Sequence, residues 1–174
     1  MLLLRITQRT VPLKRDYLYE NLGRALRFLE KQPGLPVALS GVTAVDAAVW
    51  CASDATVRKL NAKYRQQSRV TDVLAFGFAK PPQYVDQSRG GITVADLGTV
   101  VIATPFLYRR YRRVLSRGCC SEMFDVHVLK TAVHGLCHLF GYCDETEEQS
   151  KIMTEIEQRV HEALGIAGTC SAPV

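Results

Sequence analysis

Residues 131–144 read TAVHGLCHLFGYCD, and this stretch predicts both the central helix of the fold and its functional site. His134 and His138 are four residues apart, so on a helix their imidazoles leave the same face about one turn apart. Gly141 can end that helix by taking a left-handed conformation. The turn would bring Asp144 back toward the two imidazoles, in the pattern His-x-x-x-His-x-x-Gly-x-x-Asp.

These three side chains suit a metal ion. Two imidazoles and one carboxylate, with a fourth position open to water, form a ligand set of catalytic Zn²⁺. We therefore predict that His134, His138 and Asp144 bind one Zn²⁺. Cys143 is an alternative third ligand, because a thiolate also binds Zn²⁺. The other interpretation of the histidine pair is a polar helix face or two core histidines with satisfied hydrogen bonds.

The residue after the first histidine bears on the type of chemistry. Zinc peptidases with the His-Glu-x-x-His motif use the glutamate as general base. This chain has Gly135 there, so a metallopeptidase would lack its base. Zinc-bound water can reach a pKa near ~7, so hydroxide is available without such a side chain. Other zinc hydrolases stay compatible with Gly135.

Residues 134–142, HGLCHLFGY, resemble the signature of the YbeY family of metal-dependent single-strand endoribonucleases, which act in ribosomal RNA maturation. Upstream blocks are similar to the family as well: Leu60-Asn61, Tyr64-Arg65, TDVLAF at 71–76, and Leu97-Gly98 followed by VVI at 100–102. Together they cover roughly 60–153. Two positions depart from the family pattern: Asp144 replaces the third histidine, and Thr99 replaces an acidic residue.

The resemblance implies an endoribonuclease that cleaves RNA with Zn²⁺-activated water, with His134 and Arg65 as catalytic residues. In the family, the arginine at the position of Arg65 lies by the metal and is needed for activity. A guanidinium there could bind a phosphate through two hydrogen bonds and neutralise developing charge. The alternative is a solvated arginine favoured by the helix dipole. Whether water or a ribose 2′-hydroxyl attacks phosphorus stays open.

The implied partners are single-stranded ribosomal RNA and a small-subunit ribosomal protein. A second function class is a non-catalytic RNA- or ribosome-binding assembly factor of the same fold, which lost efficient chemistry when the third ligand changed to Asp144. A third class is a metallopeptidase, which Gly135 disfavours.

A further helix, expected to begin at Thr104-Pro105, carries several arginines. Arg109, Arg113 and Arg117 share one face, which could follow a phosphate backbone. The alternative is an ordinary solvated face. Arg65, Arg109 and Arg113 are thus the predicted RNA-binding residues, whereas His127, two turns before His134, is predicted to be structural.

Composition indicates one domain over residues 1–174 with a net charge of +5, a sign that suits a polyanionic partner. The six cysteines show no disulfide framework, which favours an intracellular protein. No apolar run approaches the ~20 residues that cross a bilayer, so we expect a soluble protein without a membrane partner. The first residues, MLLLRITQRTVPLKR, lack acidic groups and fit either an opening strand or a transit peptide. We therefore expect a mitochondrial or a cytoplasmic location.

The pattern of elements predicts an α+β domain, in which a small mixed sheet of about four strands packs with helices and the metal motif lies on a central buried helix. The expected strands are 2–7, 47–51, 70–76 and 97–103. The expected helices are 15–31, 54–66 after the cap Ser53, one from Thr104 to Gly118, one after the cap Ser121, and one from Thr146 to Gly165. Residues 77–96 are expected to form a loop, a candidate flap over the site, and 166–174 a frayed tail.

Overall fold

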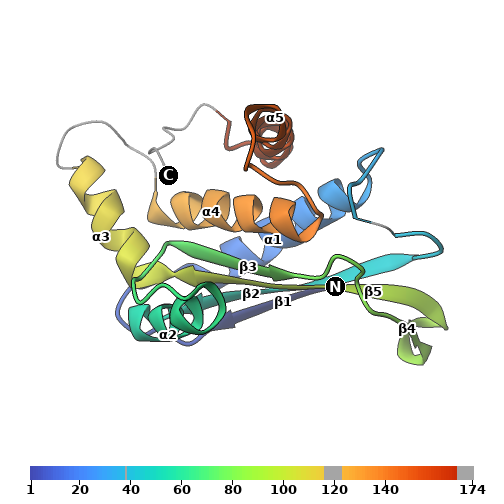
Figure 1. The fold of residues 1–174 in the computed structure, drawn as a ribbon, viewed down its shortest axis with the longest axis horizontal. Helices are drawn as coiled ribbons and strands as arrows, with labels where there is room; N and C mark the ends of the chain where they lie inside the picture. Colours follow the sequence, from blue (N-terminus) through green and yellow to red (C-terminus); the bar gives the residue numbers. More distant parts are fainter. Residues whose placement is uncertain (38, 116–122, 168–174) are drawn as a thin grey trace.

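The computed structural model describes residues 1–37, 39–115 and 123–167, and within these ranges it forms a mixed sheet with helices on both faces (Figure 1). The strands are β1 (Leu2–Ile6), β2 (Ala44–Ala52), β3 (Val73–Gly77), β4 (Gln83–Asp86) and β5 (Ile92–Ala103). The helices are α1 (Arg15–Glu30), α2 (Asp54–Arg65), α3 (Thr104–Leu115), α4 (Phe124–Leu139) and α5 (Glu147–Leu164), with a 3₁₀ turn at Gln87–Arg89. The predicted α+β class is confirmed.

The long strand β5 organises the sheet. The strand order is β1-β2-β5-β3, and β4 pairs with β5 on the same edge as β3. β1, β2 and β5 are parallel, whereas β3 and β4 are antiparallel to β5. Alternate β5 residues face opposite sides, as the two-residue period of a strand requires. Val100 and Ile102 belong to the large core, and Val101 and Ala103 to a smaller one.

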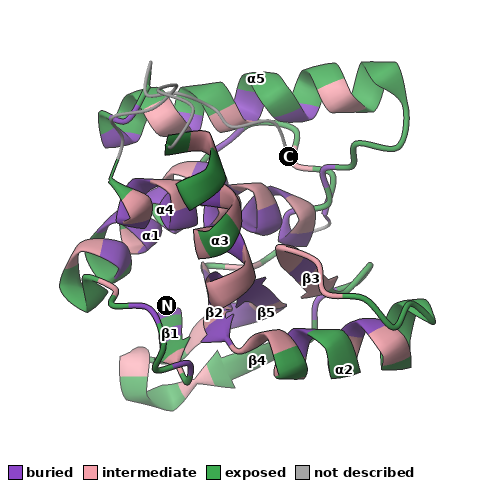
Figure 2. Cartoon of the chain, turned by 90° about the vertical axis from the view of Figure 1, so that its left-hand side faces the viewer, coloured by how far each residue is buried: buried purple, intermediate pink, exposed green. Residues whose placement is uncertain are grey.

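The two cores explain the layers. α1 and α4 cover one face of the sheet with α5 lying over them, and α2 covers the other face (Figure 1). α4 is mostly buried, whereas α5 exposes its outer side (Figure 2). The motif-bearing helix is therefore the central helix of the fold, as predicted.

Local sequence sets the helix ends that matter for the site. Gly141, with φ of 88°, turns the chain after α4. Thr146 and Gln149 form the predicted capping box at the start of α5, and Gly165 ends that helix in a left-handed conformation. Ser53 caps α2 by accepting a hydrogen bond from the backbone N–H of Thr56, also as predicted.

The prediction of a loop over 77–96 is wrong. This segment contains β4, the 3₁₀ turn and the first residues of β5. Gly90 and Gly91 have φ of 83° and 76°, which lets the chain reverse tightly. Arg89 then forms ion pairs with Asp86 at 2.8 Å and with Asp46 of β2 at 3.1 Å. The turn chemistry and these charges build an ordered hairpin, and the sheet has a fifth strand.

Smaller differences concern element ends. β2 begins at Ala44 and β3 at Val73, and α4 begins after Met123. The expected helix end Gly118 and cap Ser121 lie outside the described residues. Ile166 is buried against the core, and the part of the expected tail from 168 onward also lies outside them. None of the described helices is long and apolar enough to span a membrane.

Candidate metal centre

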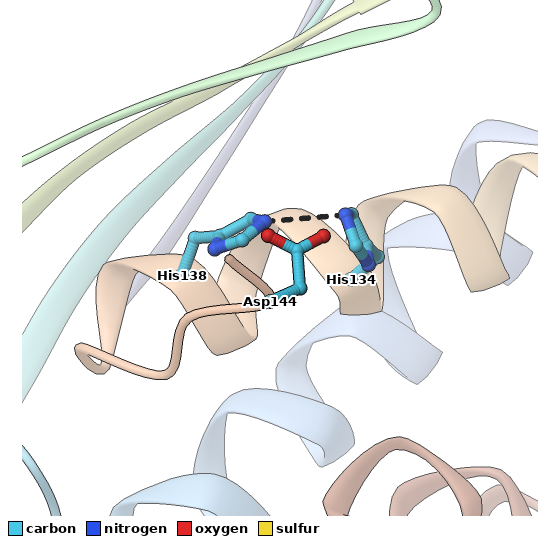
Figure 3. Close-up of side chains that lie close together, drawn as sticks. All are labelled: His134, His138 and Asp144. Carbon is cyan, nitrogen blue, oxygen red and sulfur yellow. Dashed lines mark hydrogen bonds between the residues drawn. The ribbon is translucent and has the colours of Figure 1, made fainter. Parts of the chain in front are cut away.

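Three side chains converge where α4 ends (Figure 3). His134 and His138 leave the same face of α4, and the turn at Gly141 returns Asp144 to them. One donor atom from each residue lies within 4.8 Å of the other two. Among the described residues these are the group with metal-binding geometry, and they are the three that the sequence predicts.

Hydrogen bonds fix which ring nitrogens face the centre. His138 Nδ1 lies 3.0 Å from the backbone carbonyl oxygen of Tyr142, and His134 Nδ1 lies 2.7 Å from a carboxylate oxygen of Glu157. A carbonyl or ionised carboxylate oxygen only accepts, so each Nδ1 carries the hydrogen. The Nε2 atoms of both rings are left to face each other as donors to a cation.

The spacing of these nitrogens fits a tetrahedral ion. The two Nε2 atoms are 3.2 Å apart. Two nitrogen ligands on a tetrahedral Zn²⁺, each at about 2.05 Å, would be separated by about 3.3 Å. A hydrogen bond between two Nε2 atoms needs one proton between them, and a bound cation would take the place of that proton. The donor set therefore fits a metal ion.

The charges around His134 favour a cationic group in this position. Burial lowers the pKa of His134, but the hydrogen bond and charge of Glu157, together with the charges of Asp144 and Asp72, raise it above its usual value. The same negative groups would stabilise a bound cation. Asp72 directly precedes β3, so the edge of the sheet contributes to the field of the centre.

The nearby cysteines have other roles. Cys137 is fully buried, and burial raises the pKa of its thiol far above the usual value, so the thiol stays protonated in the core. Cys143, the alternative third ligand, is exposed, and its thiol lies 3.7 Å from the carbonyl oxygen of Gly141. The described metal-binding group includes Asp144 and leaves Cys143 out.

Gly135 explains why the helix lacks a glutamate next to the first histidine. A Cβ atom at Gly135 would lie 2.4 Å from Cγ1 of Val100 on β5, which is closer than real contacts allow. The glycine lets α4 approach the sheet, and any larger side chain at this position would point into β5 rather than toward the histidines. The structure thus disfavours a glutamate base of the metallopeptidase kind.

Arg65 is the last residue of α2 and is exposed. Asn61 holds the following turn, because its amide donates to the carbonyl oxygen of Arg69 at 2.9 Å. The ring of Tyr64 packs edge-on against Phe76 of β3, with centroids 5.1 Å apart. The contact of Tyr64 brings the end of α2 beside β3, on the face of the sheet opposite α4 (Figure 1).

Of the arginines of α3, Arg109 lies away from the candidate centre, whereas Arg110 reaches Asp72, whose charge acts on His134. Arg109 forms an ion pair with Asp54 at the start of α2, about 16 Å along that helix from Arg65. It lines a hollow of about 650 Å³ that includes Thr7–Val11 and Tyr108 but not His134, His138 or Asp144. Arg110 pairs with Asp72 at 3.0 Å, and Arg113 is exposed. Arg117 lies outside the described residues. His127 stacks on Tyr111 at 5.8 Å, which agrees with a structural role.

Sequence analysis missed two partners of the histidines, Glu157 and the Tyr142 carbonyl. Glu157 is one of several acidic residues on α5, and no spacing within that helix distinguishes it. The Tyr142 carbonyl belongs to the backbone, so it depends on the turn at Gly141 and not on residue type. Only the packing of α5 against α4 identifies Glu157 as the partner of His134.

A single α+β unit that gathers two imidazoles and a carboxylate at the end of its central helix defines an α+β protein with a candidate metal centre among the residues that the structure describes. A sequence model of the family described as Endoribonuclease YbeY matches residues 7–165, and the chain belongs to this family.

The relatives agree with this assignment. Endoribonuclease YbeY of Rhodopseudomonas palustris (strain HaA2) is 36% identical over 122 residues, which cover 70% of this chain and 59% of that protein. Endoribonuclease YbeY of Agrobacterium fabrum is 30% identical over 152 residues, 84% of this chain and 78% of the relative. The chain thus spans less than two thirds of the R. palustris protein.

A solved structure has the same fold. The solution structure of TM1509 from Thermotoga maritima matches with a TM-score of 0.56 and 21% identity, covering 95% of this chain and 90% of that one. This likeness supports the α+β architecture.

Proposed function

We propose that the chain is a metal-dependent endoribonuclease that cleaves single-stranded RNA in ribosomal RNA maturation, and that Zn²⁺ is its metal. The family named Endoribonuclease YbeY supports the reaction class. The observation that carries the proposal is the convergence of two Nε2 atoms and one carboxylate where α4 ends.

In this proposal His134, His138 and Asp144 hold the ion, and their own hydrogen bonds keep the two rings in place. When bound, Zn²⁺ supplies a Lewis acid that acidifies water and polarises a phosphoryl oxygen. Asp144 is exposed, so the open side of the centre faces solvent, from which an RNA strand can approach.

Arg65 is the proposed phosphate-binding and catalytic arginine. It carries a positive charge beside β3, and the contacts of Asn61 with Arg69 and of Tyr64 with Phe76 hold the end of α2. A guanidinium can bind a phosphate through two hydrogen bonds and stabilise charge that builds during cleavage. Arg109 and Arg113 are proposed as more distant contacts with phosphates of the same RNA strand.

Metal analysis combined with an RNA assay tests this function. The wild-type protein, purified without chelator, is expected to contain about one Zn²⁺ per chain and to cleave a single-stranded RNA. His134→Ala is expected to lose both the metal and the activity. Arg65→Ala is expected to keep the metal and to lose about 10²- to 10³-fold in cleavage rate.

Arg58→Ala is the matched control for Arg65→Ala. Arg58 is exposed on the same helix, about 10 Å away, and its replacement removes the same charge. The proposal predicts nearly wild-type cleavage for this variant. Equal losses of cleavage rate in the two variants would show that Arg65 acts only through the general positive charge of α2. A wild-type protein that contains no metal and does not cleave RNA would refute the proposed nuclease function.

A second candidate is a non-catalytic RNA- or ribosome-binding assembly factor. The exposed Asp144, at the position of a histidine in the resembling signature, favours this candidate, because a carboxylate makes the ion a weaker Lewis acid. It predicts salt-sensitive RNA binding that survives both His134→Ala and Arg65→Ala. A small-subunit ribosomal protein partner and a mitochondrial location are proposals that accompany either function.

A further inference from the structure

The last helix reaches the metal centre through one side chain. Glu157 of α5 accepts a hydrogen bond from His134 Nδ1 at 2.7 Å. The side chains of His134 and Glu157 are 20% and 22% exposed, so water only partly screens the pair. α5 is already anchored by apolar residues on its inner face, namely Met153, Ile156, Val160 and Leu164. Glu157 is therefore not needed to hold α5 in place.

The contact decides how His134 presents its ring. A carboxylate accepts at Nδ1, which leaves the lone pair of Nε2 for a cation. His138 obtains the same arrangement from the backbone carbonyl of Tyr142. The two rings thus have different supports. One depends on the turn after α4 and is independent of side-chain type, and the other depends on a single carboxylate from another helix.

We propose that Glu157 is the positioning residue of the metal centre, and that through it the docking of α5 on α4 and the binding of the ion are coupled. The inference rests on the metal-binding part of the proposed function and is independent of RNA cleavage. Outer carboxylates on metal-bound histidines orient the ring and strengthen the ligand.

The path of the chain connects the docking of α5 with the binding of the ion. Asp144 lies in the link between α4 and α5, and Glu157 lies three turns into α5. The link and α5 therefore both contact the proposed centre, the link through Asp144 as a ligand and α5 through the hydrogen bond of Glu157 with His134. An ion that binds only the docked arrangement must stabilise it, and the docked arrangement must in turn strengthen binding of the ion.

The experiment measures Zn²⁺ affinity by competition with a chromophoric chelator for the wild type, Glu157→Ala and Glu157→Gln. We expect Glu157→Ala to lose about 10- to 100-fold in affinity. Glu157→Gln is expected to fall between the two, because its amide oxygen can still accept from Nδ1 but carries no charge. Thermal melts of the metal-free variants check that all of them fold.

Two further readouts separate positioning from a general effect. ¹⁵N NMR of the metal-free protein reports the tautomer of His134, and we expect Nδ1–H in the wild type and a growing share of Nε2–H in Glu157→Ala. Hydrogen exchange of α5 amides is expected to slow on Zn²⁺ addition in the wild type and to slow less in Glu157→Ala. Glu155→Gln removes an exposed carboxylate from the same helix and should match the wild type throughout.

The outcomes are distinct. Wild-type affinity and an unchanged tautomer in Glu157→Ala would overturn this inference alone. An equal loss of affinity in Glu155→Gln would also overturn it, because the effect would then be one of net charge. A wild-type protein that binds no Zn²⁺ overturns the metal-dependent function and this inference together.

Discussion

Gly135 of α4 lies directly against Val100 of β5, so closely that a Cβ atom on the glycine would stand 2.4 Å from a methyl carbon of the valine. The position next to His134 is thus taken up by contact between helix and sheet. The absence of a glutamate general base has a packing cause.

Gly135→Ala should destabilise the protein by about 1–3 kcal/mol, the usual cost of overpacking a core. Val100→Ala in the same chain removes the two clashing methyl groups and should recover part of that loss, which a double-mutant cycle of urea unfolding measures. Gly23→Ala on α1 is the control, because the nearest atom to a Cβ there is 3.6 Å away at the end of a flexible arginine. It should be neutral or stabilising. Equal effects at the two glycines would contradict the packing argument.

Asp144 can be tested by removal and by exchange. Asp144→Ala should weaken Zn²⁺ binding by at least the 10-fold typical of outer-sphere changes, because it removes a direct donor. Asp144→His should restore binding, since imidazole is also a zinc ligand. Cys143→Ser, one residue away, is the matched control and should bind like the wild type. If Cys143→Ser loses the metal while Asp144→Ala keeps it, the third ligand is the thiol.

The His134 and Glu157 pair gives metal-free stability a specific pH dependence. Because the pKa of folded His134 is raised, its pairing contributes fully below the unfolded pKa of about 6.5 and is lost as pH rises through the folded pKa. The difference in unfolding free energy between wild type and Glu157→Gln should therefore shrink as pH increases across that range. Urea titrations in the presence of chelator measure it. A difference that grows with pH has the wrong sign and contradicts the assignment.

The lowered pKa of Asp46 predicts a separate loss of folding stability in acid. Burial raises the pKa of Asp46, but hydrogen bonds from Arg89, the terminal amine and Tyr84 outweigh it and lower the pKa from 3.8 to about 2. This contribution is present above the unfolded value and is lost as pH falls through about 2.

Asp46→Asn should therefore unfold with less dependence on pH between about 4 and 2, as followed by circular dichroism. Glu20→Gln, an exposed carboxylate change on α1, should keep the wild-type dependence. A wild-type acid profile in Asp46→Asn would show that the contacts of Asp46 on β2 with Arg89 and Tyr84 do not contribute to stability.

Much of the fold follows from local signals. The helical spacing of apolar residues, the cap at Ser53 and the capping box at Thr146 predict α1, α2 and α5 to within a residue or two. The hairpin of β4 was missed, because its order comes from two left-handed glycines and from Arg89 pairing with Asp46 far away in sequence. Local composition there resembles a loop.

The contacts of the candidate site also divide into those that follow from local sequence and those that depend on packing. His134 and His138 lie on the last turns of α4, and Asp144 follows a few residues later. The helical period and the turn at Gly141 are therefore enough to bring the three side chains together. Glu157 and Val100 meet α4 from other elements, and their contacts depend on how α5 and β5 pack. Sequence spacing carries no information on such packing.

The order of elements along the chain has a consequence for biosynthesis. Every described strand and α1 precede residue 104, whereas α4 and the three ligands follow it. A nascent chain leaves the ribosome amino end first, so the sheet emerges together with α1 and α2, while the part of it that contacts α4 is still uncovered. The helix that then covers β3 and β5 is α4, which carries both imidazoles. The growing polypeptide therefore covers β3 and β5 and gathers the proposed metal ligands at the same stage of translation.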